Sequence, residues 1–264
     1  NTYIQLSQQN KWKEAQRFFS VIEPEVQKLL QRNLANPLQN SLLWVLSYRM
    51  RVAFRLYSRS RAALALQRCT KLKQKLSRIE PKLQKFYHFV LENALRRFVL
   101  LKNKREGEYW LTRFKDMRLS EYRDLEEMYW ATIGIEAAKK ERWREAAKAF
   151  EICAKSGGSK KRLCQHNYRK SVNNLGSTYA QEGNRWARQR KWVKAIKAYK
   201  LCARYLFPSQ AVQCKVAAAN SYYNWSGEAL LQRNTDLAML RLKQCLDYYP
   251  KAALCRQRMR QLAR

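Results

Sequence analysis

Residues 130–153 read WATIGIEAAKKERWREAAKAFEIC. Small and apolar residues recur in this stretch at intervals of three and four, as Trp130, Ile133, Gly134 and Ala137, then as Ala146, Phe150 and Cys153. Such intervals place the residues on one face of an α-helix, whereas a strand would need alternation. The stretch therefore predicts two helices joined by a turn.

The same spacing returns along most of the chain. A second copy comprises Tyr222, Trp225, Ser226, Ala229, Ala238, Leu242, Cys245 and Pro250. A third comprises Asn174, Leu175, Gly176, Tyr179, Ala195, Tyr199 and Cys202. It holds seven extra residues between its halves, about two helical turns, so we expect both of its helices to be longer.

Weaker copies precede these. One comprises Leu46, Met50, Ala53, Ala62, Leu66 and Cys69, and Trp12, Ala15 and Phe19 resemble the second half of another. The segment around Trp110, Phe114 and Met117 departs furthest from the pattern. We therefore expect one repeat domain over residues 1–264 with an irregular segment at about 80–125.

The spacing resembles that of the tetratricopeptide repeat (TPR) family. The resemblance implies stacked antiparallel helical hairpins that form a right-handed superhelix, with a concave groove that binds peptides and no catalytic function. Composition independently favours an all-α fold, because seven glycines and five prolines in 264 residues leave few places to break a helix. A globular helical bundle is the alternative architecture.

Six of the seven cysteines flank predicted turns in pairs. The pairs are Cys153 with Cys164, Cys202 with Cys214, and Cys245 with Cys255. Antiparallel helices that leave a turn rise equally per residue, so cysteines at matched distances from the turn can face one another. We predict three disulfides and a free Cys69; the alternative is that cysteine fills a small buried position, as alanine would.

Disulfides persist in oxidising compartments, so this pattern points to a periplasmic or extracellular protein. The longest uncharged apolar run, Leu42 to Leu46, is far shorter than the roughly 20 residues that cross a bilayer. The chain begins with Asn1 inside an incomplete copy. We therefore expect a trimmed or mature fragment.

The charge is strongly positive, at +34 with 54 Lys and Arg against 20 Asp and Glu. Arg51, Arg55 and Arg59 are spaced by four and form one helical stripe, and Arg185, Arg188, Arg190 and Lys191 surround Trp186. One interpretation is a solvated basic surface. The other is a site for an anionic partner, which would be an acidic protein, an envelope polymer, acidic lipid or nucleic acid.

The superhelix that the resemblance implies would bind its partner on the concave face. The candidate groove residues there are Tyr48, Arg51, Arg55, Arg169, Asn173 and Tyr223.

Catalytic and cofactor sites find little support in the sequence. His88 and His166 are the only histidines, so a metal site would need His166 together with Cys153 and Cys164 as reduced thiols. Gly157 to Lys160 lacks the remaining glycines of a phosphate loop. We expect no catalytic residue, no cofactor and no bound metal.

These observations favour a non-catalytic scaffold or adaptor that binds an acidic protein partner in an envelope-associated assembly outside the cytoplasm. The alternative is a cytosolic basic helical-repeat protein that binds nucleic acid or another polyanion. A non-catalytic domain of a larger enzyme is a third reading.

Overall fold

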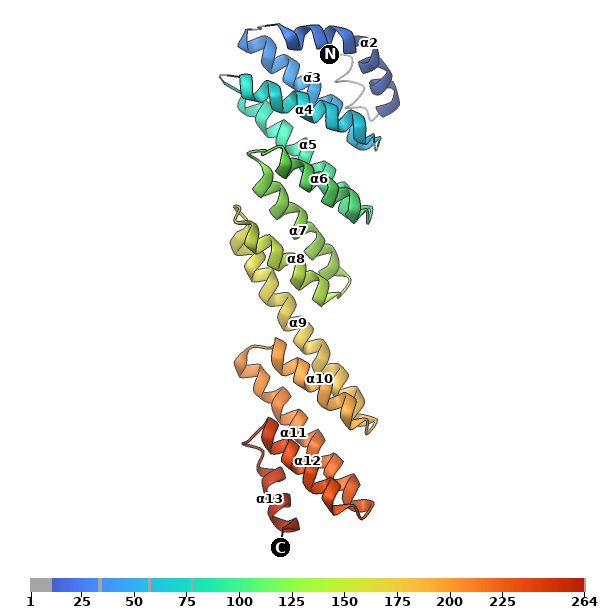
Figure 1. The fold of residues 1–264 in the computed structure, drawn as a ribbon, viewed down its shortest axis with the longest axis vertical. Helices are drawn as coiled ribbons and strands as arrows, with labels where there is room; N and C mark the ends of the chain where they lie inside the picture. Colours follow the sequence, from blue (N-terminus) through green and yellow to red (C-terminus); the bar gives the residue numbers. More distant parts are fainter. Residues whose placement is uncertain (1–10, 33–34, 57, 77, 264) are drawn as a thin grey trace. The chain divides into compact units, whose positions relative to one another are not determined.

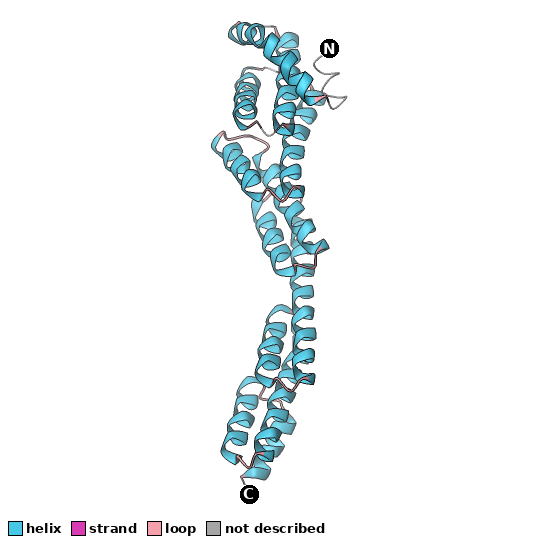
Figure 2. Cartoon of the chain, turned by 90° about the vertical axis from the view of Figure 1, so that its right-hand side faces the viewer, coloured by secondary structure: helices cyan, strands magenta, loops and turns pink. Residues whose placement is uncertain are grey.

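The computed structural model describes residues 11–32, 35–56, 58–76 and 78–263, so Asn1 lies outside the described residues. Over these ranges the chain forms twelve α-helices and no strand, which confirms the all-α prediction (Figures 1 and 2). The helices are α2 (Trp12–Gln31), α3 (Asn36–Arg55), α4 (Arg59–Lys75), α5 (Pro81–Leu100), α6 (Lys104–Asp116), α7 (Tyr122–Lys139), α8 (Trp143–Ser156), α9 (Lys161–Arg188), α10 (Trp192–Tyr205), α11 (Pro208–Leu231), α12 (Thr235–Tyr248) and α13 (Ala253–Leu262).

Extensive helix contacts join elements that are close in the sequence. They pair α2 with α3, α3 with α4, α5 with α6, α10 with α11, α11 with α12, and α12 with α13. Contacts also join α3 to α5 and α11 to α13, which skip one helix. This pattern is consistent with a helical repeat, in which each element packs on its sequence neighbours.

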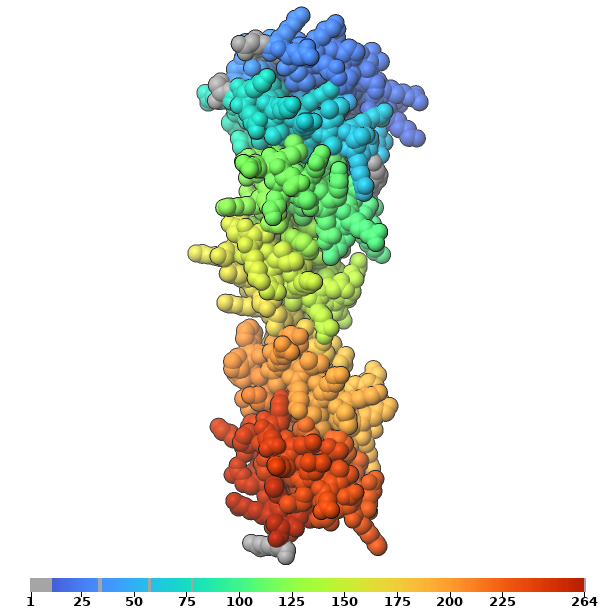
Figure 3. Space-filling model, in the orientation of Figure 1, coloured from blue at the N-terminus to red at the C-terminus, as the bar shows by residue number. Residues whose placement is uncertain are grey.

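The chain divides into two compact units. The first comprises Asn1–Ile133 with Ile152–Lys161, and the second comprises Gly134–Glu151 with Arg162–Arg264. The main hydrophobic core of the first unit runs from Ala15 to Tyr129. In the second unit, α10 to α13 follow one another in chain order, as the orange and red atoms show (Figure 3).

Six helices share a small buried residue at their fourth position. These residues are Ala15 in α2, Ala62 in α4, Gly107 in α6, Ala146 in α8, Ala195 in α10 and Ala238 in α12. A Cβ on Gly107 would lie 2.5 Å from the Tyr129 ring, so only glycine fits there without movement. Helices α5 and α6 lie within the segment at 80–125 that we expected to be irregular, and the fourth residue of α6 follows the common register.

Five turns share one backbone geometry. A positive φ just after a helix occurs at Lys102, Arg118, Glu141, Arg190 and Arg233. At Arg190, the backbone N–H donates to Ala187 O at 2.9 Å, and Lys191 N–H donates to Trp186 O at 3.0 Å. The other four turns repeat both hydrogen bonds in the same order. This is the left-handed closure common at helix C-termini, and it recurs after α5, α6, α7, α9 and α11.

The long copy in the middle of the chain has a different register from the one predicted. Helix α9 has 28 residues, whereas α10 has 14, the same length as α8. Gly183 contacts the ring of Tyr199, as Gly134 contacts that of Phe150, while Gly176 contacts Leu206. Gly183 is therefore the counterpart of Gly134, and only the first helix is longer.

The cysteines follow the predicted pattern. Cys202 and Cys214 join α10 to α11 with Cα atoms 6.0 Å apart, and Cys245 and Cys255 join α12 to α13 at 6.5 Å. Cys153 and Cys164 are also disulfide-bonded. Cys69 is free and fully buried. The three predicted cysteine pairs thus lie at disulfide distance in the structure, and Cys69 is the cysteine without such a partner.

Among the helices that the structure describes, none combines the length and the apolar character needed to span a bilayer.

Candidate binding grooves

Two of the predicted site residues line one hollow between α3 and α5. Arg51 and Arg55 contribute from α3, and Phe89, Asn93 and Arg97 contribute from α5. The hollow has a volume of about 60 Å³, and no carboxylate is among the described residues that line it. We call this hollow the arginine groove. It brings three guanidinium groups together with the buried ring of Phe54 and the exposed ring of Phe89.

Helix α2 holds the α3 side of the arginine groove in place. The guanidinium carbons of Arg51 and Arg55 each lie 5.5 Å from the centre of the Trp12 ring. A cation over an indole face is attracted by the negative charge of the ring face, which orders the side chain. The two arginines are therefore positioned rather than freely solvated.

Arg59, the third arginine of the predicted stripe, and the nearby Arg49 have structural partners. Arg59 forms an ion pair with Glu106 and lies over the Tyr109 ring. Arg49 is buried, forms an ion pair with Glu23 and lies 4.1 Å from the centre of the Phe19 ring. The stripe thus separates into groove residues and residues that join helices.

Tyr48 lies in the core rather than in the arginine groove. Tyr48 is only 6% exposed. The centre of its ring lies 4.4 Å from the centre of the Phe86 ring, between α3 and α5. Trp44 stacks on the same Phe86 at 4.8 Å. Tyr48 therefore supports the arginine groove through packing, and its ring is not accessible to a partner.

Asn173 lines a second hollow, between α9, α10 and α11. Its polar lining residues are Asn173, Ser177, Gln181, Asn184, Gln210 and Gln213, and the volume is about 590 Å³. We call it the amide groove. None of its described lining residues is charged, although the chain carries +34. The Asn173 Oδ1 atom is buried without a hydrogen-bond partner.

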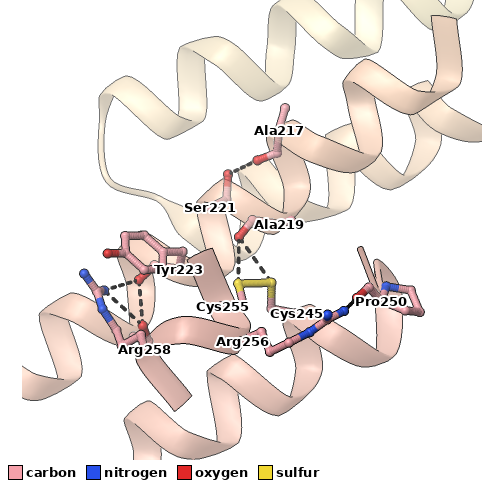
Figure 4. Close-up of a disulfide and its surroundings, with 10 residues drawn as sticks. Ala217, Ala219, Ser221, Tyr223, Cys245, Pro250, Cys255, Arg256 and Arg258 are labelled. Carbon is pink, nitrogen blue, oxygen red and sulfur yellow. Dashed lines mark hydrogen bonds between the residues drawn. A yellow bond between two sulfur atoms is a disulfide. The ribbon is translucent and has the colours of Figure 1, made fainter. Parts of the chain in front are cut away.

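Arg169 and Tyr223 line neither hollow. Arg169 is exposed on α9. The Arg258 guanidinium lies 3.4 Å from the centre of the Tyr223 ring and donates to Tyr223 O at 3.0 Å, which ties α11 to α13 (Figure 4). Nearby, both sulfur atoms of the Cys245–Cys255 disulfide lie against Ala219 O.

Reasoning from sequence missed the α5 side of the arginine groove. Phe89, Asn93 and Arg97 are spaced by four, as Arg51 and Arg55 are, so a search for matching stripes on the two helices would have found them. The glutamines of the amide groove carried no comparable signal, because uncharged polar residues occur on many helix faces.

The residues considered for a metal site and for a phosphate loop have other partners in the structure. The metal site would need reduced Cys153 and Cys164, but both are disulfide-bonded. In the turn at Gly157 to Lys160, the backbone N–H of Lys160 donates to Glu127 Oε2 at 2.7 Å. The described residues contain no cluster of three or more His, Cys, Asp or Glu side chains that could hold a metal ion.

Comparison with known proteins adds no relative: no protein-family model matches the chain, and no curated protein matches it. The functional argument therefore depends on the grooves and on the physical chemistry of their residues.

Proposed function

We propose that this chain is a non-catalytic scaffold of the TPR kind that binds an acidic segment of a protein partner in the arginine groove. The observation that carries the proposal is the convergence of Arg51, Arg55 and Arg97 around one hollow beside Phe89. A guanidinium presents paired N–H donors that match both oxygens of a carboxylate. The exposed Phe89 ring, 48% accessible, offers an apolar contact next to these charges.

A solenoid architecture is part of the proposal. Contacts between sequence neighbours, the matching turns after α5, α7, α9 and α11, and the six small buried residues are what stacked hairpins of one kind require. In such an array, first helices line one face, so contacts such as α3 with α5 would form the floor of a binding surface.

The amide groove supports binding of an extended peptide. Asparagine and glutamine side chains each offer donors and an acceptor, which match the N–H and C=O groups of a peptide main chain. The unpartnered Asn173 Oδ1 gives this groove an acceptor without a donor. Because the groove is uncharged, its contribution to binding would depend little on salt.

An oxidising location, periplasmic or extracellular, belongs to the same proposal. Three disulfide-bonded hairpins are stable where thiols are not kept reduced. Crosslinks would also offset the self-repulsion of a body with a charge of +34. Assembly with an acidic envelope protein would lower that repulsion further.

The test measures binding of a labelled acidic peptide that contains aromatic residues, at 0.15 M salt, where the screening length is about 8 Å. Arg51→Glu/Arg55→Glu should weaken binding at least about 30-fold, since charge-assisted hydrogen bonds contribute roughly 1.5 to 3 kcal/mol each. Arg61→Glu/Arg113→Glu is the matched control, with the same charge change at exposed positions of the first unit.

Arg97→Ala is a second variant, because it alters the groove from α5 and leaves the contacts with Trp12 intact. It should weaken binding by about 10-fold on the same basis. Equal losses in the groove variants and in the control would show that only net charge matters, and the arginines would revert to solvated surface. Tight, salt-resistant binding of a single-stranded nucleic acid with sequence preference would favour the polyanion-binding alternative.

A further inference from the structure

Helix α10 carries a continuous exposed stripe. Its inward face comprises Ala195, Ile196, Ala198, Tyr199 and Cys202, all of them buried. The opposite face presents Val193, Lys197, Lys200 and Arg204, at intervals of three and four, which place them within one narrow sector of a helix with 3.6 residues per turn. The exposed Phe207 follows in the turn between α10 and α11, and we call these five residues the α10 stripe.

The two ends of the α10 stripe are apolar and exposed. Val193 is 62% exposed at the first turn, and Phe207 is 50% exposed after the last. Basic residues occupy the positions between them. Exposure of a phenylalanine and a valine to water is unfavourable, and burying them against a partner would be favourable. Their placement around a basic centre therefore points to a partner surface that is both anionic and apolar.

The surroundings of the stripe are free of acidic side chains in the sequence. Between Glu182 and Glu228 the chain has nine Lys and Arg and no Asp or Glu. At the start of α10, the cationic groups of Arg185, Lys191 and Lys194 lie 4.7, 5.1 and 4.8 Å from the centre of one ring, that of Trp186. Like charges this close repel one another, and a layer of negative charge would relieve that repulsion.

We infer that the α10 stripe docks the second unit onto an anionic phospholipid surface. Lys197 and Arg204 would lie against lipid phosphates, and Val193 and Phe207 would enter the boundary between headgroups and acyl chains. From Val193 to Arg204 the stripe follows about three turns of α10, or roughly 16 Å at helical rise, so it would contact several headgroups at once. None of its residues lines either groove.

A lipid surface fits the stripe better than a polynucleotide does. Both offer phosphates, but only the lipid surface has an apolar layer for the ends of the stripe. Binding of single strands relies on aromatic rings open to the bases, whereas the Trp186 ring already carries three cations. Lys200 donates to the Tyr222 hydroxyl at 3.1 Å and lies over the Tyr248 ring, so the stripe's accessible charges are Lys197 and Arg204.

The experiment measures co-sedimentation of the full oxidised chain with phosphatidylcholine vesicles, with and without phosphatidylglycerol. Wild type should bind only the anionic vesicles. Lys197→Gln/Arg204→Gln should lower binding about 30-fold at low salt, given the attraction of each basic residue to an anionic leaflet. The matched control is Lys251→Gln/Arg260→Gln, which makes the same charge change at exposed positions of the same unit and should lower binding less than threefold.

A second variant separates insertion from charge. Val193→Ser/Phe207→Ser keeps the net charge, and we expect it to lower binding to anionic vesicles at least about fivefold while leaving binding to a single-stranded polynucleotide unchanged. Equal vesicle binding by this variant and wild type would overturn the inference, as would a control pair that loses as much as the stripe pair. Circular dichroism and the count of free thiols verify that each variant is folded.

Discussion

Gly183 lies directly against the aromatic ring of Tyr199. A Cβ at position 183 would stand 2.5 Å from Tyr199 Cε1, a distance that real Cβ atoms do not reach. Gly134 has the same relationship with Phe150, at 2.7 Å. In both cases a glycine near the end of one helix accepts a ring from the helix that follows, so the two helices approach closely.

Gly183→Ala should therefore destabilise the second unit. The ring of Tyr199 is held by a hydrogen bond from its hydroxyl to Asn184 Oδ1 at 2.7 Å, so it cannot move away without cost. Overpacking of this kind costs about 1 to 3 kcal/mol, partly offset by the better helix propensity of alanine. We expect a net loss of about 1 to 2 kcal/mol in the free energy of unfolding by urea.

The matched control for that substitution is Gly227→Ala in α11. The nearest atom to a Cβ there is the flexible end of Arg258, at 3.3 Å. Alanine should be neutral or stabilise by up to about 1 kcal/mol, because glycine is costly inside a helix. Equal destabilisation by the two substitutions would contradict the close packing at Gly183.

The common turn makes a second prediction, at Arg190, which has a φ of 57°. Left-handed backbone costs L-residues with a Cβ roughly 1 to 2 kcal/mol. We expect Arg190→Gly to be more stable than Arg190→Ala by about 1 kcal/mol, measured by urea unfolding. At the neighbouring Gln189, which does not have a positive φ, the order should reverse. The same order at both positions would be evidence against the left-handed turn.

Thiol chemistry gives a third prediction. Burial raises the pKa of Cys69 to about 12, so its thiol should not react with iodoacetamide at pH 8 in the folded protein. Mass spectrometry without reductant should find no alkylation of the native chain and one alkylated cysteine after denaturation. Seven alkylated cysteines under denaturing conditions would show that the chain has no disulfides, and the argument for an oxidising compartment would fail.

Glu121 links α4 to the turn before α7 and makes a fourth prediction. Burial alone would raise the pKa of its carboxyl, but hydrogen bonds from Lys73 and Ser120 outweigh burial and lower the pKa below 4.5. A carboxyl whose pKa is lower in the folded state stabilises above the unfolded value, and this stabilisation is lost as pH falls through the folded value. Stability should therefore decrease below about pH 4.5.

Glu121→Gln tests this link. It leaves the largely buried Lys73 without its partner, so we expect a loss of about 3 kcal/mol at pH 7 and a weaker dependence of unfolding on pH below 4.5. Glu25→Gln removes an exposed pair with Lys28 and serves as the control, with little change expected. An unchanged acid dependence in Glu121→Gln would show that other carboxylates govern acid unfolding.

The sequence by itself determined the helical class and which cysteines lie together as pairs. Both depend on short-range geometry. Apolar residues three and four apart define a helix face. Cysteines at equal distances from a turn meet because they lie at the same level along the axes of the two antiparallel helices. That is why Cys202 with Cys214 and Cys245 with Cys255 were predictable as pairs. The pattern of small residues was predictable too, except in α6, where Gly107 replaces alanine.

Only the tertiary structure decided which helix was lengthened, which side chains are covered and which residues meet across helices. Gly176 and Gly183 are seven residues apart, two helical turns, so both fit the sequence pattern, and contact with Tyr199 distinguishes them. Tyr48 proved to be buried against Phe86, while Arg97 reached the hollow beside Arg51 and Arg55. A helix's own period shows which residues share a face, but the rotation and height of the neighbouring helix decide what that face touches.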